Sequence, residues 1–336
     1  AGNWSHQYAD PGNSANSGDE LVKGGLGVLW YGDPGPDMMV NRHQGAVGPL
    51  VVDGRLFVQG EDNLMAYDAY NGQFLWQVPN PKAIRTGVFQ NRTPGNLAAG
   101  DGRLFHMVRD FVYEHDAATG KVIATHPIPD SIDKKTHEWG YLAYRDGLLF
   151  GTATIRGEVA DQNRRRRGDP GAAATDFIFA IEIKTGKHLW VYKGKSINFQ
   201  TIAIGPGRVY FIDSSVTSEQ RAEILRQDKS ELKTLTGEAA KNAEARMKKL
   251  DVRLAVGLDA RTGERIWDTA VDVTDCSEIG IGGGKLTMMY HDDVLLLCGA
   301  NANGHYWKQF VGGEFSRRRI VALYALEGYK LWAKDA

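Results

Sequence analysis

The 336-residue sequence is short of cysteine, of net charge and of long apolar runs. Its two cysteines, Cys276 and Cys298, are too few for a disulfide framework and lack the spacing of a zinc site. Because 40 Lys and Arg balance 41 Asp and Glu, no overall field attracts a nucleic acid or an anionic membrane. No stretch approaches the roughly 18 apolar residues of a spanning helix. Composition therefore favours a globular chain with no nucleic-acid partner and no transmembrane segment.

Glycine is the residue in excess. The chain has 40 glycines but 11 prolines, and this imbalance favours many tight turns between β-strands. The 42% hydrophobic and 24% charged residues are ordinary for a globular protein, and the length allows one large domain or two smaller ones.

A nine-residue pattern recurs five times. Each copy holds a glycine, in three of them preceded by threonine, and in four copies a tryptophan follows that glycine four positions later. A side chain of this size is expected to anchor one repeat against the next. The copies span 68–76, 116–124, 182–190, 259–267 and 324–332, with Gly72, Gly120, Gly186, Gly263, Gly328, Trp76, Trp190, Trp267 and Trp332 at the marked positions.

A second signature, Asp-Gly followed by apolar residues, precedes the copies. It occurs at Asp53, Asp101 and Asp146, with degenerate forms at 206–207 and 292–293. Asp-Gly between apolar runs is a strong hairpin signal. Each unit is thus predicted to hold four antiparallel strands, in the first unit at about 46–52, 55–60, 64–69 and 73–78. Four-stranded units in tandem predict an all-β protein, a β-propeller with five full blades.

The spacing between the repeats is uneven because three units carry insertions between their second and third strands. Without these insertions the spacing approaches the roughly 40–50 residues of a blade. All three insertions are expected to leave one face, where loops on a rigid scaffold carry function. The longest, at 217–251, is predicted to be a charged helical hairpin with Ser218 near its start. The expected organisation is an N-terminal segment at 1–44 and blades at 45–79, 87–127, 137–193, 197–270 and 278–333.

The Asp-x-x-Thr-Gly-x-x-x-Trp pattern resembles the tryptophan-docking repeat of the quinoprotein (PQQ-like) β-propeller superfamily, over about 45–332. That group includes pyrroloquinoline-quinone (PQQ) alcohol dehydrogenases and the outer-membrane assembly lipoprotein BamB. The dehydrogenases hold PQQ with an adjacent Cys-Cys ring, a tryptophan and a calcium ion bound by carboxylate and amide groups. Cys276 and Cys298 are not adjacent, and no calcium motif can be assigned, which argues against a quinone dehydrogenase.

The resemblance also bears on how the ring closes. Residues 26–31 resemble one more fourth strand, with Trp30 in the tryptophan position and no first three strands before it. Family members usually have seven or eight blades. The resemblance therefore implies a larger ring whose remaining blades come from a continuation of the chain or from a second chain. The alternative is a five-bladed ring with 26–31 packed at its periphery.

Residues just before each first strand are expected to meet at one mouth of the central channel, a default ligand site. Their cationic, acidic and amide groups suit a polar or anionic ligand, or a metal held by histidine and carboxylate. A water-filled channel lined by polar residues is the alternative. The candidates are Arg42, His43, Arg92, Asn96, His137, Glu138, Trp139, Asn198, Gln200, Asp275, Cys276 and Glu278.

Two further features fall in the insertions. His305 and Trp307 either form an aromatic patch for sugars or flat ligands, or pack as a small local core. Arginine runs at 164–167 and 317–319 either bind anions or belong to solvated loops. Cys276 and Cys298 are expected near the same mouth, either as a disulfide or as free thiols.

Three functions remain open. The favoured one is a secreted or periplasmic scaffold that binds a protein or polysaccharide through the face that bears the insertions, because the fold signal is strong and no catalytic motif is found. The second is a quinone- or metal-dependent oxidoreductase that uses His43, His137 and Glu138 at the channel mouth. The third is a carbohydrate-recognising module of a larger secreted enzyme.

Overall fold

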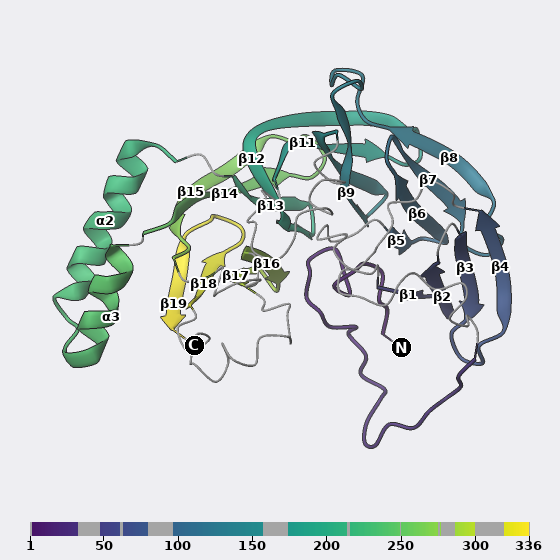
Figure 1. Ribbon diagram of the computed structural model, residues 1–336, viewed down its shortest axis with the longest axis horizontal. Helices are drawn as coiled ribbons and strands as arrows, with labels where there is room; N and C mark the ends of the chain where they lie inside the picture. The colour runs from purple at the N-terminus through teal and green to yellow at the C-terminus, as the bar shows by residue number, and fades with distance from the viewer. Residues whose placement is uncertain are drawn as a thin grey trace. The chain divides into compact units, whose positions relative to one another are not determined.

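The computed structural model (Figure 1) describes residues 2–32, 48–60, 63–79, 97–156, 174–213, 216–248, 250–274, 276, 286–299 and 319–335. They belong to two compact units. Unit 1 comprises Ala1–Gly194 with Arg261–Gly263, and unit 2 comprises Lys195–Ala260 with Glu264–Ala336. Within the described ranges, no helix is both long and apolar enough to cross a membrane.

Unit 1 holds two complete antiparallel sheets and most of a third, with the strands of each sheet paired in chain order. The first sheet consists of β1 (Leu50–Val52), β2 (Arg55–Gln59), β3 (Asn63–Asp68) and β4 (Phe74–Pro79). The second consists of β5 (Leu97–Gly100), β6 (Arg103–Val108), β7 (Phe111–Asp116) and β8 (Val122–Pro127). The third starts with β9 (His137–Arg145), β10 (Leu148–Ile155), β11 (Ala174–Glu182) and the first part of β12 (Lys187–Gly205).

Unit 2 takes up the second part of β12. The 19-residue β12 is long enough to end one four-stranded set and begin the next, and the strand order runs without a break from β9 to β15. The remaining strands are β13 (Arg208–Asp213), β14 (Val252–Asp259), β15 (Arg265–Asp272), and the separate sheet β16 (Leu286–His291), β17 (Val294–Gly299), β18 (Arg319–Tyr324) and β19 (Lys330–Asp335). Helices α2 (Ser218–Leu232) and α3 (Gly237–Met247) lie between β13 and β14 in the chain. The predictions of four-stranded antiparallel units and of a helical hairpin are confirmed.

The Asp-Gly turns have the backbone that the sequence predicts. Asp53 and Gly54 have φ of 50° and 73°, and the pairs at 101–102 and 146–147 have similar values. Positive φ at both central residues defines the type I′ turn, which matches the twist of a β-hairpin. The degenerate pair Asp292 and Asp293 adopts the same conformation, at 43° and 59°. Aspartate therefore replaces glycine in this turn without changing its geometry.

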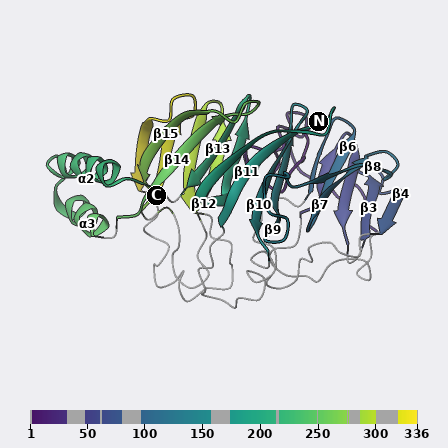
Figure 2. The same ribbon diagram turned by 90° about the horizontal axis from the view of Figure 1, so that it is seen from above.

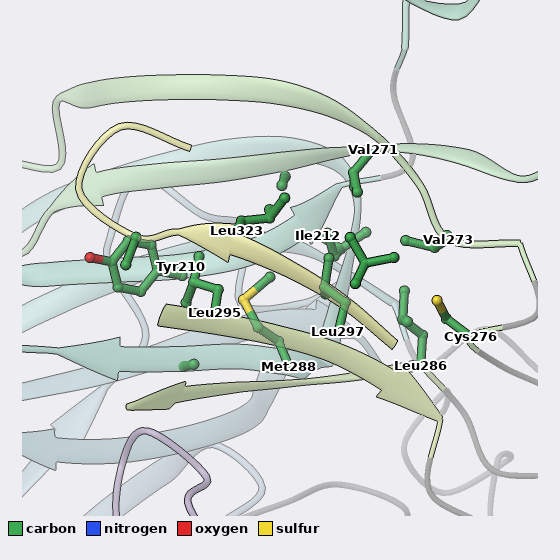
Figure 3. Packing of buried hydrophobic residues seen from close by; sticks show 14 of the residues in the cluster. Tyr210, Ile212, Val271, Val273, Cys276, Leu286, Met288, Leu295, Leu297 and Leu323 are labelled. Carbon is green, nitrogen blue, oxygen red and sulfur yellow. The ribbon is translucent and has the colours of Figure 1, made fainter. Parts of the chain in front are cut away.

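Each apolar core lies between the facing sides of consecutive sheets. In unit 1, one core joins the first two sheets, and a second core joins the second sheet to β9, β10 and β11. In unit 2, residues of β13, β14 and β15 pack against β16, β17 and β18 (Figure 3). Cys276 belongs to this core and is 2% exposed. Both cysteines are free, so the alternative of a Cys276–Cys298 disulfide does not hold.

The repeat tryptophans join neighbouring sheets through the glycine turns. The Trp76 indole on β4 donates to the carbonyl of Ala117, 3.1 Å away, and its ring lies against Gly120 in the next sheet. In unit 2, Trp267 donates to Ala325 in the same way and lies against Gly328. A Cβ on Gly120 would come within 2.6 Å of the Trp76 ring. Positive φ and this close approach together explain the glycine of the repeat.

Residues 26–31 form no strand, although the sequence analysis expected one. Trp30 nevertheless behaves as a repeat tryptophan, because its indole donates to the Ala69 carbonyl over 2.9 Å and lies against Gly72. The neighbouring Leu26 and Tyr31 are 84% and 94% exposed. The correction is that the tryptophan signal here marks a docked side chain and not a β-strand.

The start of the chain lies across the first strands of all three sheets of unit 1. Trp4 pairs with Val51 on β1, and the carbonyl of Ser5 accepts from the Ala99 amide on β5. The Nε2 atom of His6 accepts from the Tyr144 amide on β9 at 3.0 Å. Each strand residue is two positions before its Asp-Gly turn. Three consecutive residues therefore satisfy equivalent backbone groups on three first strands.

A buried ion pair joins two sheets of unit 2. Arg319 on β18 contacts the Asp272 carboxylate on β15, and their side chains are 4% and 7% exposed. Asp272 also accepts from the Thr274 amide. The suggestion that the arginine run at 317–319 binds anions is thus wrong for Arg319, whose charge is used internally.

We expect Arg319→Leu to lower the free energy of unfolding by about 3–5 kcal/mol, because it leaves the Asp272 carboxylate buried without its cation. Arg265→Leu is the matched control. Arg265 pairs with Asp268 at 2.7 Å but its side chain is 55% exposed, so the loss should be below about 1 kcal/mol. Urea denaturation of both variants compares them, and equal losses would show that burial does not set the strength of this pair.

Candidate functional site

A small pocket lies where β9 begins, next to two of the predicted site residues. Its volume is about 250 Å³. The pocket combines one acidic and three basic side chains with an apolar floor. It is lined by Asp110, Phe111, Pro127, Ile128, Lys134, His137 and Arg156.

His137 has a fixed orientation in this pocket. Its Nε2 lies 3.0 Å from Oδ2 of Asp176 on β11, and its Nδ1 lies 2.9 Å from the Thr136 hydroxyl. The ring also meets Phe177 edge-on, with 5.3 Å between centroids. Both ring nitrogens are engaged. His137 can therefore bind a polar group of a ligand at the pocket wall only if that group replaces the Thr136 hydroxyl or the Asp176 carboxylate.

Arg156, just after β10, brings a guanidinium to the pocket. Its guanidinium contacts the Asp110 carboxylate and donates to the Lys134 carbonyl from Nε at 2.9 Å. Nη1 lies 3.7 Å from the Glu138 carboxylate. The pocket is therefore a set of paired opposite charges, which suits a hydrogen-bonded polar ligand better than a bare anion.

The remaining predicted residues are more scattered. Trp139 is fully buried and its indole donates to the His126 carbonyl at 3.1 Å. Its assignment to a ligand surface is corrected, because an indole with no exposed surface packs the core. The buried Cys276 is corrected for the same reason. In unit 2, Asn198 accepts from the Gln200 amide at an irregularity of β12.

Eight of the predicted site residues lie outside the described residues. They are Arg42, His43, Arg92, Asn96, Asp275, Glu278, His305 and Trp307. The run at 164–167 and residues 317–318 are also outside them. By contrast, Asp110, Arg156 and Asp176 were missed by the sequence analysis. Asp110 and Arg156 flank strands and Asp176 lies within β11, each without a motif, so only strand pairing brings them to His137.

A second surface lies in unit 2, where the helical hairpin meets its sheet. Thr217 and Gln220 form a reciprocal capping box at the start of α2, with bonds of 2.9 and 3.1 Å. The cap is thus Thr217 and not Ser218. Between α2 and β15 lies a pocket of about 520 Å³ whose lining includes Glu223, Ile224 and Tyr329. Figure 2 shows α2 and α3 side by side as a hairpin.

Comparison with solved structures defines the class of protein. The chain is 15% identical to a quinohemoprotein alcohol dehydrogenase from Pseudomonas putida HK5, with a TM-score of 0.55 over 99% of this chain and 48% of that chain. The corresponding enzyme from Comamonas testosteroni gives 14% identity and a TM-score of 0.54, over 99% and 49%. This chain thus spans about half the length of either structure. The fold is that of a β-propeller of four-stranded antiparallel blades, of the PQQ-like kind.

The family follows from the sequence. The profile described as "Outer membrane protein assembly factor BamB" matches residues 15–233. The chain therefore belongs to this family, within the PQQ-like propeller superfamily. The structure of BamB from Moraxella catarrhalis is 11% identical, with a TM-score of 0.46 over 87% of this chain and 65% of that one. A search among curated proteins gave no match.

Two parts of the PQQ and calcium site that the resemblance implies are not found among the described residues. No group of three or more His, Cys, Asp or Glu among them is placed to hold a metal ion. The buried Trp139 has no free ring face to place beneath a quinone.

Proposed function

We propose that this protein is a scaffold that binds a polypeptide partner, using the α2–α3 hairpin and the adjoining surface of β15. One observation carries the proposal: of the described side chains in the hairpin, Ala243 alone is buried. A hairpin that served as an internal brace would bury an apolar stripe against its sheet. Here Leu235 is 38% exposed, and α2 and α3 carry mostly polar side chains.

The pocket at the base of the hairpin supports the same proposal. Ile224, Leu323 and Tyr329 supply apolar surface, while Glu223 and Lys330 supply charge of both signs at its edge. Concave apolar surface with a polar rim is typical of protein-binding sites. The family description, an outer-membrane protein assembly factor, supports a polypeptide over a polysaccharide as the partner. It also supports a periplasmic or extracellular location.

The proposal is tested by placing a photo-crosslinking amino acid at single exposed positions in the native host. We expect Ala222 on α2 and Ala239 on α3 to give the same discrete protein adduct, because both belong to the proposed surface. Thr262, exposed on the β14–β15 turn, is the matched control and should give none. Adducts of equal yield at all three positions, or none at the hairpin, would overturn the proposal.

Removal of the hairpin separates binding from folding. We expect replacement of 218–248 by a short Gly-Ser linker to shift the Tm by less than about 3 °C, because little apolar surface is lost. The same variant should lose the adduct when the crosslinker is placed instead at Tyr329 beside the pocket. A large fall in Tm would show that the hairpin is a brace.

A further inference from the structure

The tryptophan repeat contains one site whose tryptophan is missing. Trp30, Trp76, Trp190 and Trp267 lie against Gly72, Gly120, Gly263 and Gly328 respectively. The second sheet has Ala124 in the tryptophan position, so no indole from that strand reaches Gly186 on the third sheet. Apart from the neighbours of Gly186 in the chain, no atom of the described residues lies within 4 Å of where a Cβ on Gly186 would be. Gly120 and Gly328 are buried beneath their indoles, whereas Gly186 is exposed.

The turn around Gly186 nevertheless keeps the geometry of the filled sites. Its φ is 68°, compared with 73° at Gly120. The Gly186 amide bonds to the carbonyl four residues earlier at 2.8 Å, as the Gly120 amide does. The Ile183 amide donates to the Gly147 carbonyl, as Ala117 donates to Gly102. Ala117 uses its carbonyl to accept the Trp76 indole, so Ile183 presents the equivalent acceptor.

The second sheet does not fill the site at the Gly186 turn with a side chain of its own. On β3 and β4, Ala66 is paired with Trp76, whereas on β7 and β8, Glu114 is paired with Ala124. In the first sheet the large residue of this pair is therefore on the fourth strand, whereas in the second sheet it is on the third strand. Glu114 is 1% exposed and lies 2.8 Å from His126. Its carboxylate is held inside by this contact and by Arg103, so it does not replace the indole at the Gly186 turn.

The strand beside the site presents apolar surface to the outside. Val122 and Ile123, at the start of β8, are 53% and 51% exposed. β8 is the edge strand of its sheet in the described part of the chain, and no charged residue lies between Lys121 and His126. Exposed, uncharged edge strands are receptive to an added extended segment.

We infer that the Gly186 turn, with the Ile183 carbonyl and the β8 edge, is a docking site for a tryptophan side chain on an extended segment of a partner polypeptide. The filled sites of the same chain identify the occupant: an indole that stacks on the glycine and donates its N–H to the carbonyl three residues before. This inference rests on the proposed polypeptide-binding function. It adds the Gly186 turn as a second surface that contacts the partner, and tryptophan as the partner side chain that binds there.

The test uses a fluorescein-labelled peptide with the sequence of residues 330–334, Lys-Leu-Trp-Ala-Lys, which is this chain's own tryptophan-bearing strand. Its counterpart has alanine for tryptophan. By fluorescence polarisation, the tryptophan peptide should bind the intact chain about tenfold more tightly than its counterpart. Ala124→Trp should abolish this preference, because an indole from the same chain then fills the site. Ala118→Trp, on the exposed turn of the same sheet, is the matched control and should keep it.

Two further variants keep the outcome clear. If Ala124→Trp disturbs the sheet, Glu114→Ala/Ala124→Trp restores the small-large pairing of Ala66 and Trp76, and Gly186→Ala introduces a Cβ into the site. Each should remove the preference while circular dichroism stays unchanged. Equal binding of both peptides to the intact chain would overturn the inference. So would a concentration-dependent dimer lost in both Trp332→Ala and Ala124→Trp, which would make a second copy the occupant.

The two proposals fail separately. Loss of hairpin adducts with retained peptide preference would overturn the hairpin as the partner-binding surface and leave the Gly186 site in place. Hairpin adducts that persist in Ala124→Trp with no peptide preference in the intact chain would overturn the Gly186 site alone.

Discussion

Replacing Trp76 by alanine is expected to lower the free energy of unfolding by about 3–5 kcal/mol, within the range for a buried aromatic side chain. Trp76 is 7% exposed, packs on Phe57 with 6.0 Å between ring centroids, and donates to Ala117 in the next sheet. The change therefore removes core volume and an inter-sheet hydrogen bond together. Urea denaturation followed by circular dichroism measures the loss.

Trp332→Ala is the matched control for this prediction. Trp332 occupies the same repeat position on β19 but is 45% exposed, so by its smaller buried area its loss should cost only about 2 kcal/mol. Similar losses for both variants would mean that the repeat tryptophan stabilises its own strand and not the contact between sheets.

Acidification from pH 7 to pH 5 is expected to lower the free energy of unfolding by about 4 kcal/mol through His6 and His106. Burial lowers the pKa of each from 6.5 to about 3, and the neighbouring Arg145 lowers the pKa of His6 further in the same direction. The folded state resists protonation, so the unfolded chain binds more protons below pH 6.5. Stability then falls by about 1.4 kcal/mol per pH unit for each histidine, until the pH reaches the folded value.

The geometry at His6 gives the structural cause. Its Nε2 accepts from the Tyr144 amide, and its Nδ1 lies 2.7 Å from the Ser5 hydroxyl. Protonation of Nε2 would remove that acceptor and free a backbone amide of β9. His6→Gln and His106→Gln should each remove about 2 kcal/mol of the loss between pH 7 and 5, as measured by urea denaturation at each pH. Burial also lowers the pKa of His115 and His126, so part of the pH dependence remains in both variants. His291→Gln, whose side chain is 66% exposed, should keep the wild-type slope, and unchanged slopes in both buried variants would contradict the account.

The repeats were predictable because turn chemistry is local. Asp53 and Gly54 need positive φ whatever surrounds them, so the Asp-Gly and Thr-Gly steps located the hairpins. The prediction of a strand at 26–31 was wrong. The tryptophan at position 30 is explained by its docking on the Gly72 turn, and this docking does not require a strand around Trp30. Periodicity cannot distinguish a strand from a docked side chain over six residues.

The candidate site was less predictable, because it depends on contacts distant in sequence. His137 and Asp176 come together only through the pairing of β9, β10 and β11. Trp139 was misassigned since residues at the start of a strand alternate between the two faces of the sheet, and it points into the core. The unfilled site at Gly186 could be predicted in part, because the sequence has Ala124 where the other copies of the repeat have tryptophan.

Hydrogen exchange of the indole N–H groups tests the central claim, that repeat tryptophans join successive sheets by docking on glycine turns. In 15N-labelled protein, the assigned Trp76 and Trp267 indole protons should exchange with solvent deuterium several orders of magnitude more slowly than that of Trp332. Exchange of all three at the same fast rate would contradict the docking geometry and, with it, the chemistry assigned to the Gly186 site.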